Sequence, residues 1–218
     1  LTAIPSNVWL VGEGDSTIIQ HNSTSSFNVF SGTNVSNIQI RDLQVKCNST
    51  GIPGVAFNGS SGCSDIVFDN VKFINNNTNA SPLVASITFG HGIAYTNTEV
   101  YSRIGIQNCY LYNVMVIFQS SHKACFVREC SFSYSASGNS TSYYMRMYGI
   151  GSGNSLIIEN NHFIDTAGRG INISLIASGN TVGYTPLIFR NNYIGIVDTR
   201  LFYFQPGIGT NTAGQNDH

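Results

Sequence analysis

The hydrophobic positions of this chain follow one pattern that recurs six times between Ile38 and Ile194. In each copy, apolar residues stand at positions 0, 2 and 7, and an Asn, Asp or Glu stands at position 4. Alternation at positions 0 and 2 is typical of a strand with one buried face, and a recurring unit of this kind is typical of stacked repeats. The copies begin at Ile38, Ile66, Ile104, Cys125, Leu156 and Leu187.

A second alternating strand is predicted before, between and after these copies. Its inward pairs recur every 26 to 32 residues, close to one turn of a large β-solenoid. Position 7 starts a third short strand, and parallel strands need right-handed crossovers. We therefore predict an all-β, right-handed, single-stranded parallel β-helix of about seven coils with three strands per coil. The inward pairs are Phe27/Val29, Val55/Phe57, Ile87/Phe89, Val116/Phe118, Met145/Met147, Ile171/Ile173 and Phe202/Phe204.

The polar residue at position 4 is expected in a tight, partly left-handed bend, where Asn is favoured. Its side chain can hydrogen-bond the same bend of the next coil, so the predicted role of this ladder is structural. Asp42 and Glu129 depart from the Asn pattern. The remaining members are Asn70, Asn108, Asn160 and Asn191.

Three strands per coil with an Asn-rich bend resemble the right-handed parallel β-helix of the pectin-lyase-like superfamily. The resemblance covers residues 1–209, and residues 210–218 form a polar tail. In that superfamily the second strand of each coil is called PB1, and its outer face usually binds the substrate. The fold does not specify the function, because the superfamily includes lyases, hydrolases, epimerases, phage tailspikes and non-catalytic adhesins.

Charge and hydropathy narrow the choice of partners. Only 10% of the residues are charged and the net charge is -1, so no strong field attracts nucleic acid or anionic lipid. No apolar run approaches the roughly 18 to 20 residues of a membrane span. No helix is predicted to cover the edge of the first coil, so we expect a fragment of a longer protein or ends covered by partner chains. An extracellular, secreted or virion-surface assembly, such as a homotrimer, is favoured.

The five cysteines are an odd number, which excludes a complete disulfide framework. Cys109 and Cys130 occupy the same position of successive copies, and Cys125 stands at an inward strand position, so buried thiols are predicted. A bridge between Cys47 and Cys63 stays open, because both flank strand ends. No Cys/His spacing suits a zinc site.

The outer positions of PB1 carry amides, hydroxyls and tyrosines, which suit sugar rings. Aromatic faces stack on C–H surfaces, and amides bind hydroxyl groups in pairs. An ordinary solvated polar face is the alternative. The candidate substrate-binding residues are Gln119, Tyr144, Arg146, Tyr148, Asn172, Tyr203 and Gln205.

The candidate catalytic residues lie just before PB1. Arg169 and Arg200 each precede an inward PB1 residue by two, and Asp165 and Asp198 come four and two residues before them. Two carboxylates on neighbouring coils could act as acid and base in glycoside cleavage. The resemblance to pectate lyases implies another possibility, in which the carboxylates hold Ca²⁺ while an arginine abstracts a proton. Two loop-fixing Asp–Arg ion pairs are the third possibility.

Two further features point to structure rather than chemistry. Residues 90–92, Gly-His-Gly, match a triplet of polygalacturonase-type hydrolases, but the acidic residues that accompany it there are missing. The outer column of the first strands carries charges of alternating sign, which suits a salt-bridge ladder. That column contains Arg41, Asp69, Gln107, Arg128, Glu159 and Arg190.

Two functions are compatible with these observations. The first is a polysaccharide lyase or glycoside hydrolase acting in a groove along PB1. The second is a non-catalytic glycan-binding or structural module of a phage tail fibre or an adhesin. No metal site and no cofactor is predicted, apart from Ca²⁺ if the chain is a lyase.

Overall fold

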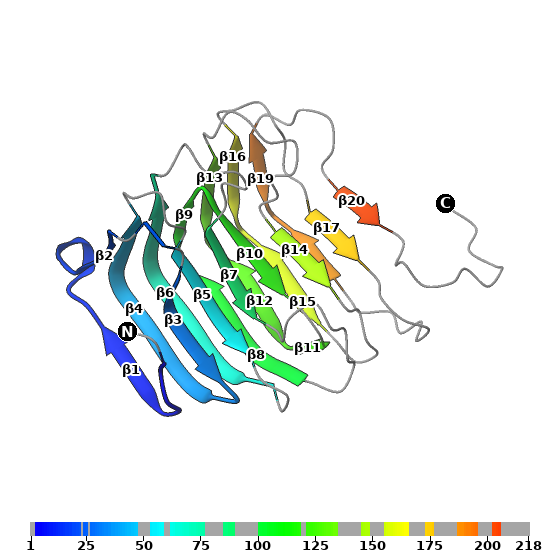
Figure 1. Cartoon of the computed structure of the whole chain (residues 1–218). Coiled ribbons are helices and arrows are strands. Elements are labelled where there is room, and N and C mark those ends of the chain that lie inside the picture. The colour runs from blue at the N-terminus through cyan, green and yellow to red at the C-terminus, as the bar shows by residue number, and fades with distance from the viewer. Residues whose placement is uncertain are drawn as a thin grey trace.

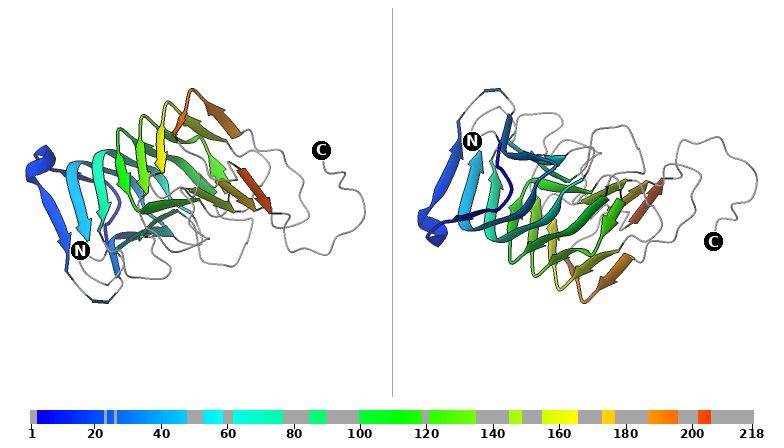
Figure 2. Two further views of the ribbon diagram at one scale, coloured as in Figure 1. Left: turned by 90° about the horizontal axis from the view of Figure 1, so that it is seen from above. Right: turned by 90° about the horizontal axis from the view of Figure 1, so that it is seen from below.

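The computed structural model of the chain is nearly all β-structure, with parallel strands in two sheets and one short 3-10 helix, Gly14–Ser16. The strands follow one another from β1 at one end to β20 at the other (Figure 1). The two sheets form separate layers when the molecule is viewed from above and from below (Figure 2). The described residues are 3–22, 24–25, 27–47, 53–58, 62–76, 85–89, 100–118, 121–134, 145–148, 155–165, 173–176, 187–195 and 202–205.

The large sheet has thirteen strands and contains the repeated pattern. The first strands of the repeats are β1 (Val8–Val11), β4 (Ser36–Cys47), β6 (Ser64–Asn75), β8 (Val100–Gln107), β12 (Cys125–Arg128), β15 (Leu156–Glu159) and β18 (Leu187–Arg190). The third strands are β2 (Ile18–His21), β9 (Tyr110–Tyr112), β13 (Ser131–Tyr134), β16 (His162–Asp165) and β19 (Tyr193–Gly195). β4 and β6 are long enough to include both strands of a repeat, and β11 (Ser121–Lys123) pairs with β8.

The small sheet has seven strands and contains the predicted second strands. Every strand pairs in parallel with the corresponding strand of the next repeat. Its strands are β3 (Phe27–Thr33), β5 (Pro53–Asn58), β7 (Ala85–Phe89), β10 (Val114–Phe118), β14 (Met145–Tyr148), β17 (Ile173–Ile176) and β20 (Phe202–Gln205).

The predicted left-handed bend is present at position 4 of all six repeats, where φ lies between 52° and 56°. Asn70 donates from Nδ2 to Oδ1 of Asp42 at 2.8 Å, as expected for a ladder. Asn108 instead donates to Asp69 at 2.8 Å. The left-handed backbone therefore recurs in every repeat, whereas the side-chain ladder is only partly formed.

A second left-handed bend, which was not predicted from the sequence, occurs at the residue directly before position 0 of five repeats. Its residues have φ between 52° and 63°. Because a Cβ atom disfavours this conformation and Asn tolerates it, alanine is the least suited residue in this set. The bend residues are Asn7, Asn37, Asp65, Arg103 and Ala124.

The substitution Ala124→Asn is expected to stabilise the protein by about 0.5–1 kcal/mol, because it places an Asn where φ is 52°. The side chain of Ala124 is exposed, and its N–H donates to Ser155 Oγ at 2.9 Å in either variant. Urea denaturation measures the change. Ala124→Val is the matched control and should lower stability, since β-branched residues tolerate positive φ poorly. A lower midpoint for the Asn variant would contradict the prediction.

A seventh copy of the pattern occurs in β1 and β2, which the sequence analysis did not count. Val8 lies beside Ile38, and Ile19 lies beside Val45. The two apolar positions are 11 residues apart in this copy and seven apart in the next. The 3-10 helix Gly14–Ser16 lies within this longer connection, which hides the repeat in the sequence.

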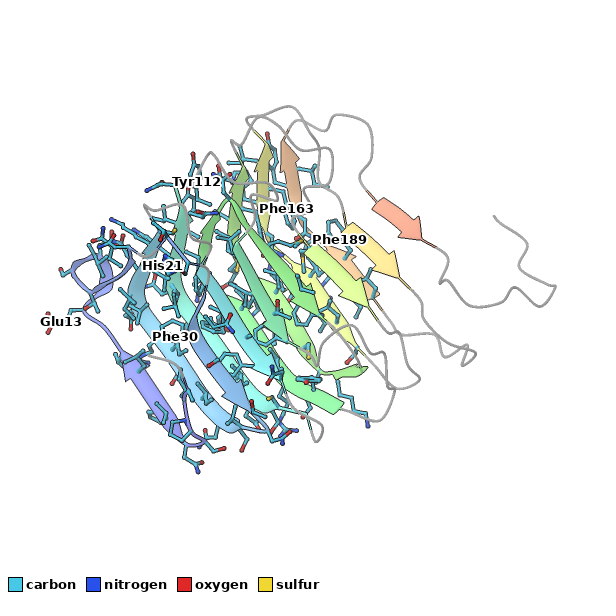
Figure 3. All side chains as sticks on the ribbon, viewed as in Figure 1. Glu13, His21, Phe30, Tyr112, Phe163 and Phe189 are labelled. Carbon is cyan, nitrogen blue, oxygen red and sulfur yellow. The ribbon has the colours of Figure 1, made fainter. Side chains whose placement is uncertain are left out.

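Phenylalanine rings stack in two groups inside the fold, and Figure 3 labels Phe30 and Phe163, one from each group. Phe68 lies at the centre of the first group and connects the two sheets, with ring centroids 5.5–6.5 Å from four neighbours. The second group stacks at 4.8 and 6.3 Å. The first group is Phe30, Phe57, Phe68, Phe73, Phe89 and Phe118, and the second is Phe132, Phe163 and Phe189.

Position 5 of the repeats forms an inner ladder of hydrogen-bond donors. In four successive repeats its side chain donates to the carbonyl oxygen at position 2 of the preceding repeat. The distances are 3.7 and 3.5 Å for the two thiols, and 3.0 and 2.9 Å for the two amides. The donors are Cys109, Cys130, Asn161 and Asn192, while the two earlier repeats have Leu43 and Val71.

All five cysteines are buried and free, as predicted for the thiols inside the repeats. Burial raises the pKa of Cys125 to about 11, so this thiol stays protonated at neutral pH. The possible bridge between Cys47 and Cys63 is not formed. Cys47 Sγ instead lies 3.7 Å from His21 Nδ1, and Cys63 donates to the Asn58 carbonyl oxygen at 3.4 Å.

Candidate functional site

The small sheet contains the strands whose outer face was predicted to bind the substrate. Its register places Arg146 beside Ser174, and Ser174 beside Tyr203. The next column contains Tyr148 and Gln205 on either side of Ile176. Four predicted binding residues (Arg146, Tyr148, Tyr203 and Gln205) therefore share two columns across β14, β17 and β20.

The predicted inward pair Ile171/Ile173 is wrong by two residues. Met145 lies beside Ile173, and Met147 lies beside Leu175. Ser174, and not Asn172, consequently occupies the column of Arg146. The sequence alternates apolar residues at 171, 173 and 175, so period-2 patterning alone allows either register.

Of the predicted pair Phe27/Val29, Val29 is buried as predicted, but the pair does not lie in register with Val55 and Phe57. Phe30 lies beside Val55, and Gly32 lies beside Phe57, after an irregularity in the pairing between Asn28 and Phe30. The fully buried ring of Phe30 occupies the inward position. The residue beside Ala56 at the outer position is Ser31, whereas the predicted inward pair would place Asn28 there; Asn28 instead lies beside Gly54.

Most of the predicted catalytic residues lie outside the described residues. The Gly-His-Gly triplet at residues 90–92 also lies outside the described residues. Asp165 is the last residue of β16, and its Cα partner is Tyr134 in β13. Asp165 thus ends a strand instead of lying in the loop before PB1. The other predicted site residues outside the described part are Gln119, Tyr144, Arg169, Asn172, Asp198 and Arg200.

Asp165 belongs to a register column whose described side chains are polar and buried. The column runs from β2 through β4 and β6, and it continues through Tyr134 to Asp165. Asn75 and Asn113 each donate an amide N–H to the carbonyl oxygen of the other, at 3.4 and 3.1 Å. Burial lowers the pKa of His21 at the start of the column. The buried members are His21, Cys47, Asn75 and Asn113, each exposed by at most 1%.

The column of alternating charges on the large sheet is confirmed by the register. Arg190 forms an ion pair with Glu159 at 2.7 Å. Arg128 donates twice to Gln107, at 2.7 and 3.1 Å, and Arg41 pairs with its neighbour Asp42 at 3.4 Å. The predicted salt-bridge ladder is therefore formed only in part.

A hollow of about 430 Å³ opens on the outer face of the large sheet, a site that the sequence analysis missed. It is lined by apolar side chains from position 1 of the repeats and by an ion pair at its margin. A possible signal was present in the sequence, because position 1 is an outer position and still carries several apolar residues. The principal lining residues are Trp9, Gln39, Asp65, Val67, Arg103 and Phe126.

The ion pair at this margin is bidentate. Arg103 donates from Nε to Asp65 Oδ1 at 2.5 Å and from Nη2 to Oδ2 at 2.6 Å. The guanidinium group lowers the pKa of the Asp65 carboxyl, so the carboxylate stays ionised. Both partners are substantially exposed, and their contribution to stability is therefore small.

Neither a metal cluster nor a membrane span is apparent in the part of the chain that the structure describes. No group of three or more His, Cys, Asp or Glu residues is arranged there to hold a metal ion. No helix there is long and apolar enough to cross a membrane. Comparison of the chain with family models, curated proteins and solved structures found no match.

Proposed function

We propose that the chain is a right-handed parallel β-helix of the pectin-lyase-like type, with three strands per coil, and that it binds and cleaves a polysaccharide on the outer face of the small sheet. Its place of action would be extracellular or on a virion surface, within a larger assembly. The alternation of successive segments between two parallel sheets supports the architecture.

The observation that carries the proposal is the register of β14, β17 and β20. It places Arg146 two strands from Tyr203, which is about 10 Å at the usual strand spacing. Tyr148 and Gln205 stand at the same separation in the neighbouring column. A cation, two phenols and an amide within this area suit the hydroxyl and carboxyl groups of an acidic sugar chain.

The proposed reaction uses Asp165 and Asp198 as acid and base, with Arg169 and Arg200 beside them. Asp165 continues a register column whose described side chains are polar, and a general acid or base of glycoside cleavage is usually a carboxyl group of this kind. Ca²⁺, which a lyase reaction would imply, needs several oxygen ligands. Among the residues that the structure describes, no group of three or more His, Cys, Asp or Glu is arranged to bind a metal ion.

The substitutions Asp165→Asn and Asp198→Asn are expected to abolish the release of reducing ends from acidic polysaccharides and to leave binding intact. Removing a general acid or base costs about 10² to 10⁴ in rate. The control is Glu13→Gln, since Glu13 is exposed and lies at the outer edge of the molecule in Figure 3. Full activity in both Asp variants would reject the assignment.

Binding without cleavage is the second candidate function, because the register supports the binding residues while Asp198 lies outside the described part of the chain. In that case the wild-type protein shortens no polysaccharide, but Arg146→Ala and Tyr203→Ala still weaken its binding. Size-exclusion analysis of the polysaccharide together with affinity measurements separates the two functions.

A further inference from the structure

The hollow on the large sheet is a short trough that crosses four strand spacings. Position 1 of successive repeats contributes its floor and its ends, and these residues lie side by side in register. At about 4.8 Å per strand, the trough extends roughly 19 Å from β1 to β12. Trp9 stands at one end with 69% of its surface exposed, and Phe126 stands at the other. The floor positions between them are Gln39 and Val67, while the ring of Phe126 covers Gly105.

The ring of Phe126 is held in place by two neighbouring residues. A Cβ atom on Gly105 would lie 2.1 Å from Cζ of Phe126, so the ring covers a space that only glycine leaves open. The guanidinium group of Arg128 lies over the ring, 4.5 Å from its centroid, and Gln107 accepts hydrogen bonds from that arginine. The aromatic ring is thus preorganised, which lowers the entropic cost of binding a ligand against it.

The polar margin of the trough retains hydrogen-bonding capacity. Arg103 uses two of its five N–H groups on Asp65 and has three others, while each Asp65 oxygen has a further lone pair. Asn37 donates to Asn7 Oδ1 at 2.9 Å, which holds its amide at the edge. The charges of Arg103 and Asp65 cancel, and the other lining residues are uncharged.

We infer that this trough is a second carbohydrate site, which binds a neutral oligosaccharide across β1, β4, β6, β8 and β12. Trp9 would stack on the C–H face of a sugar ring, Phe126 would contact the sugar chain through its ring edge, and the Arg103–Asp65 fork and Gln39 would bind hydroxyl groups. The site lies on a different sheet from the proposed PB1 groove and does not depend on it.

Charge and size favour a neutral sugar chain over the alternatives. The lining residues of the trough carry a net charge of zero, which offers little attraction for a uronic acid polymer or for nucleic acid. A stable protein interface buries about 800 Å² on each partner, which is more than a trough with one exposed ring, one half-buried ring and one valine provides. A length of roughly 19 Å suits an oligosaccharide rather than a single sugar.

Trp9 reports on this site directly, because it is the only tryptophan in the chain. Titration with cellohexaose, xylohexaose, mannohexaose and maltohexaose should shift its fluorescence to shorter wavelength and protect it from iodide quenching, for at least one of the four. Hexagalacturonate should leave the signal unchanged. No response to any neutral oligosaccharide at millimolar concentration would overturn the inference, and so would a response to the acidic one alone.

Four variants test the assignment by calorimetric titration with the oligosaccharide that binds. Trp9→Ala and Phe126→Ala should each weaken binding about tenfold, whereas Trp9→Phe should retain most of it. Gly105→Ala should weaken binding as much as Phe126→Ala, because its methyl group displaces the ring. The control is Tyr193→Ala, which removes another aromatic residue, 61% exposed, from a third strand.

The outcomes separate this site from the PB1 groove. Unchanged affinity in both Trp9→Ala and Phe126→Ala, with thermal midpoints equal to wild type, would overturn the inference. Arg146→Ala and Tyr203→Ala should not change binding of the neutral oligosaccharide, and a loss in these variants would assign the sugar to the PB1 face instead. A Trp9 response to protein partners but to no sugar would make the trough a protein-binding surface and would also overturn it.

Discussion

The substitution Phe68→Ala is expected to lower the free energy of unfolding by about 3–5 kcal/mol, the usual cost of removing a buried phenylalanine ring. Phe68 is fully buried, and its ring contacts rings from both sheets. Truncation would leave a cavity that the surrounding strands cannot close, because each is fixed by backbone pairing on both sides. Denaturation in urea, followed by circular dichroism, measures the loss.

Val67→Ala provides the matched control for this prediction. Val67 precedes Phe68 in the same strand, but it faces outward and is only partly buried. Its truncation should cost less than about 1 kcal/mol. Equal losses in the two variants would show that the phenylalanine group does not connect the sheets as inferred.

The second large effect is expected for Asn161→Val, with a loss of about 2–4 kcal/mol. Asn161 is 2% exposed, and its side chain accepts from the Cys130 N–H at 2.9 Å and donates to the Val127 carbonyl oxygen at 3.0 Å. It also donates to Asn192 Oδ1 at 3.0 Å. A valine at this position can neither accept from the Cys130 N–H nor donate to the Val127 carbonyl oxygen. Each buried polar group left without a hydrogen bond costs about 1–3 kcal/mol of stability.

The comparison variant is Cys130→Val, at the same position one repeat earlier. Its thiol is a weak donor, at 3.5 Å from the Ile106 carbonyl oxygen, and a valine of similar volume should cost only about 1 kcal/mol. If Asn161→Val is no more destabilising than Cys130→Val, the amide ladder contributes no more than apolar packing. Thermal denaturation of both variants under the same conditions decides this point.

Much of the architecture could be predicted from the sequence. When repeats as regular as these stack on one another, the same positions of every repeat must be apolar and face inward. The apolar residues at positions 0, 2 and 7 of the first five copies, such as Ile38, Ile40 and Val45, are buried as expected, and those of the last copy are partly buried. The left-handed bends at position 4 and the buried cysteines were also predicted, because the same residue types recur at the same positions of successive repeats. The copy at Val8 was not found, since its two apolar positions are separated by four more residues than in the other repeats.

The candidate sites were less predictable than the core. For β17, the choice between Asn172 and Ser174 beside Arg146 depended on a shift of two residues, which leaves the hydrophobic pattern unchanged. For the trough, Trp9 and Phe126 are 117 residues apart in the sequence. Their relation appears only when four intervening strand pairings are known.

The sequence by itself determined which residues of the large sheet face inward and where the chain bends at position 4, because burial of apolar side chains repeats with the period of the backbone. The tertiary structure alone decided how far each strand is shifted against its neighbour and which outer residues become neighbours. Outer positions bury little surface, so no hydrophobic pattern records their partners. The trough between Trp9 and Phe126 is therefore a property of the strand register, while the phenylalanine core is a property of the repeat.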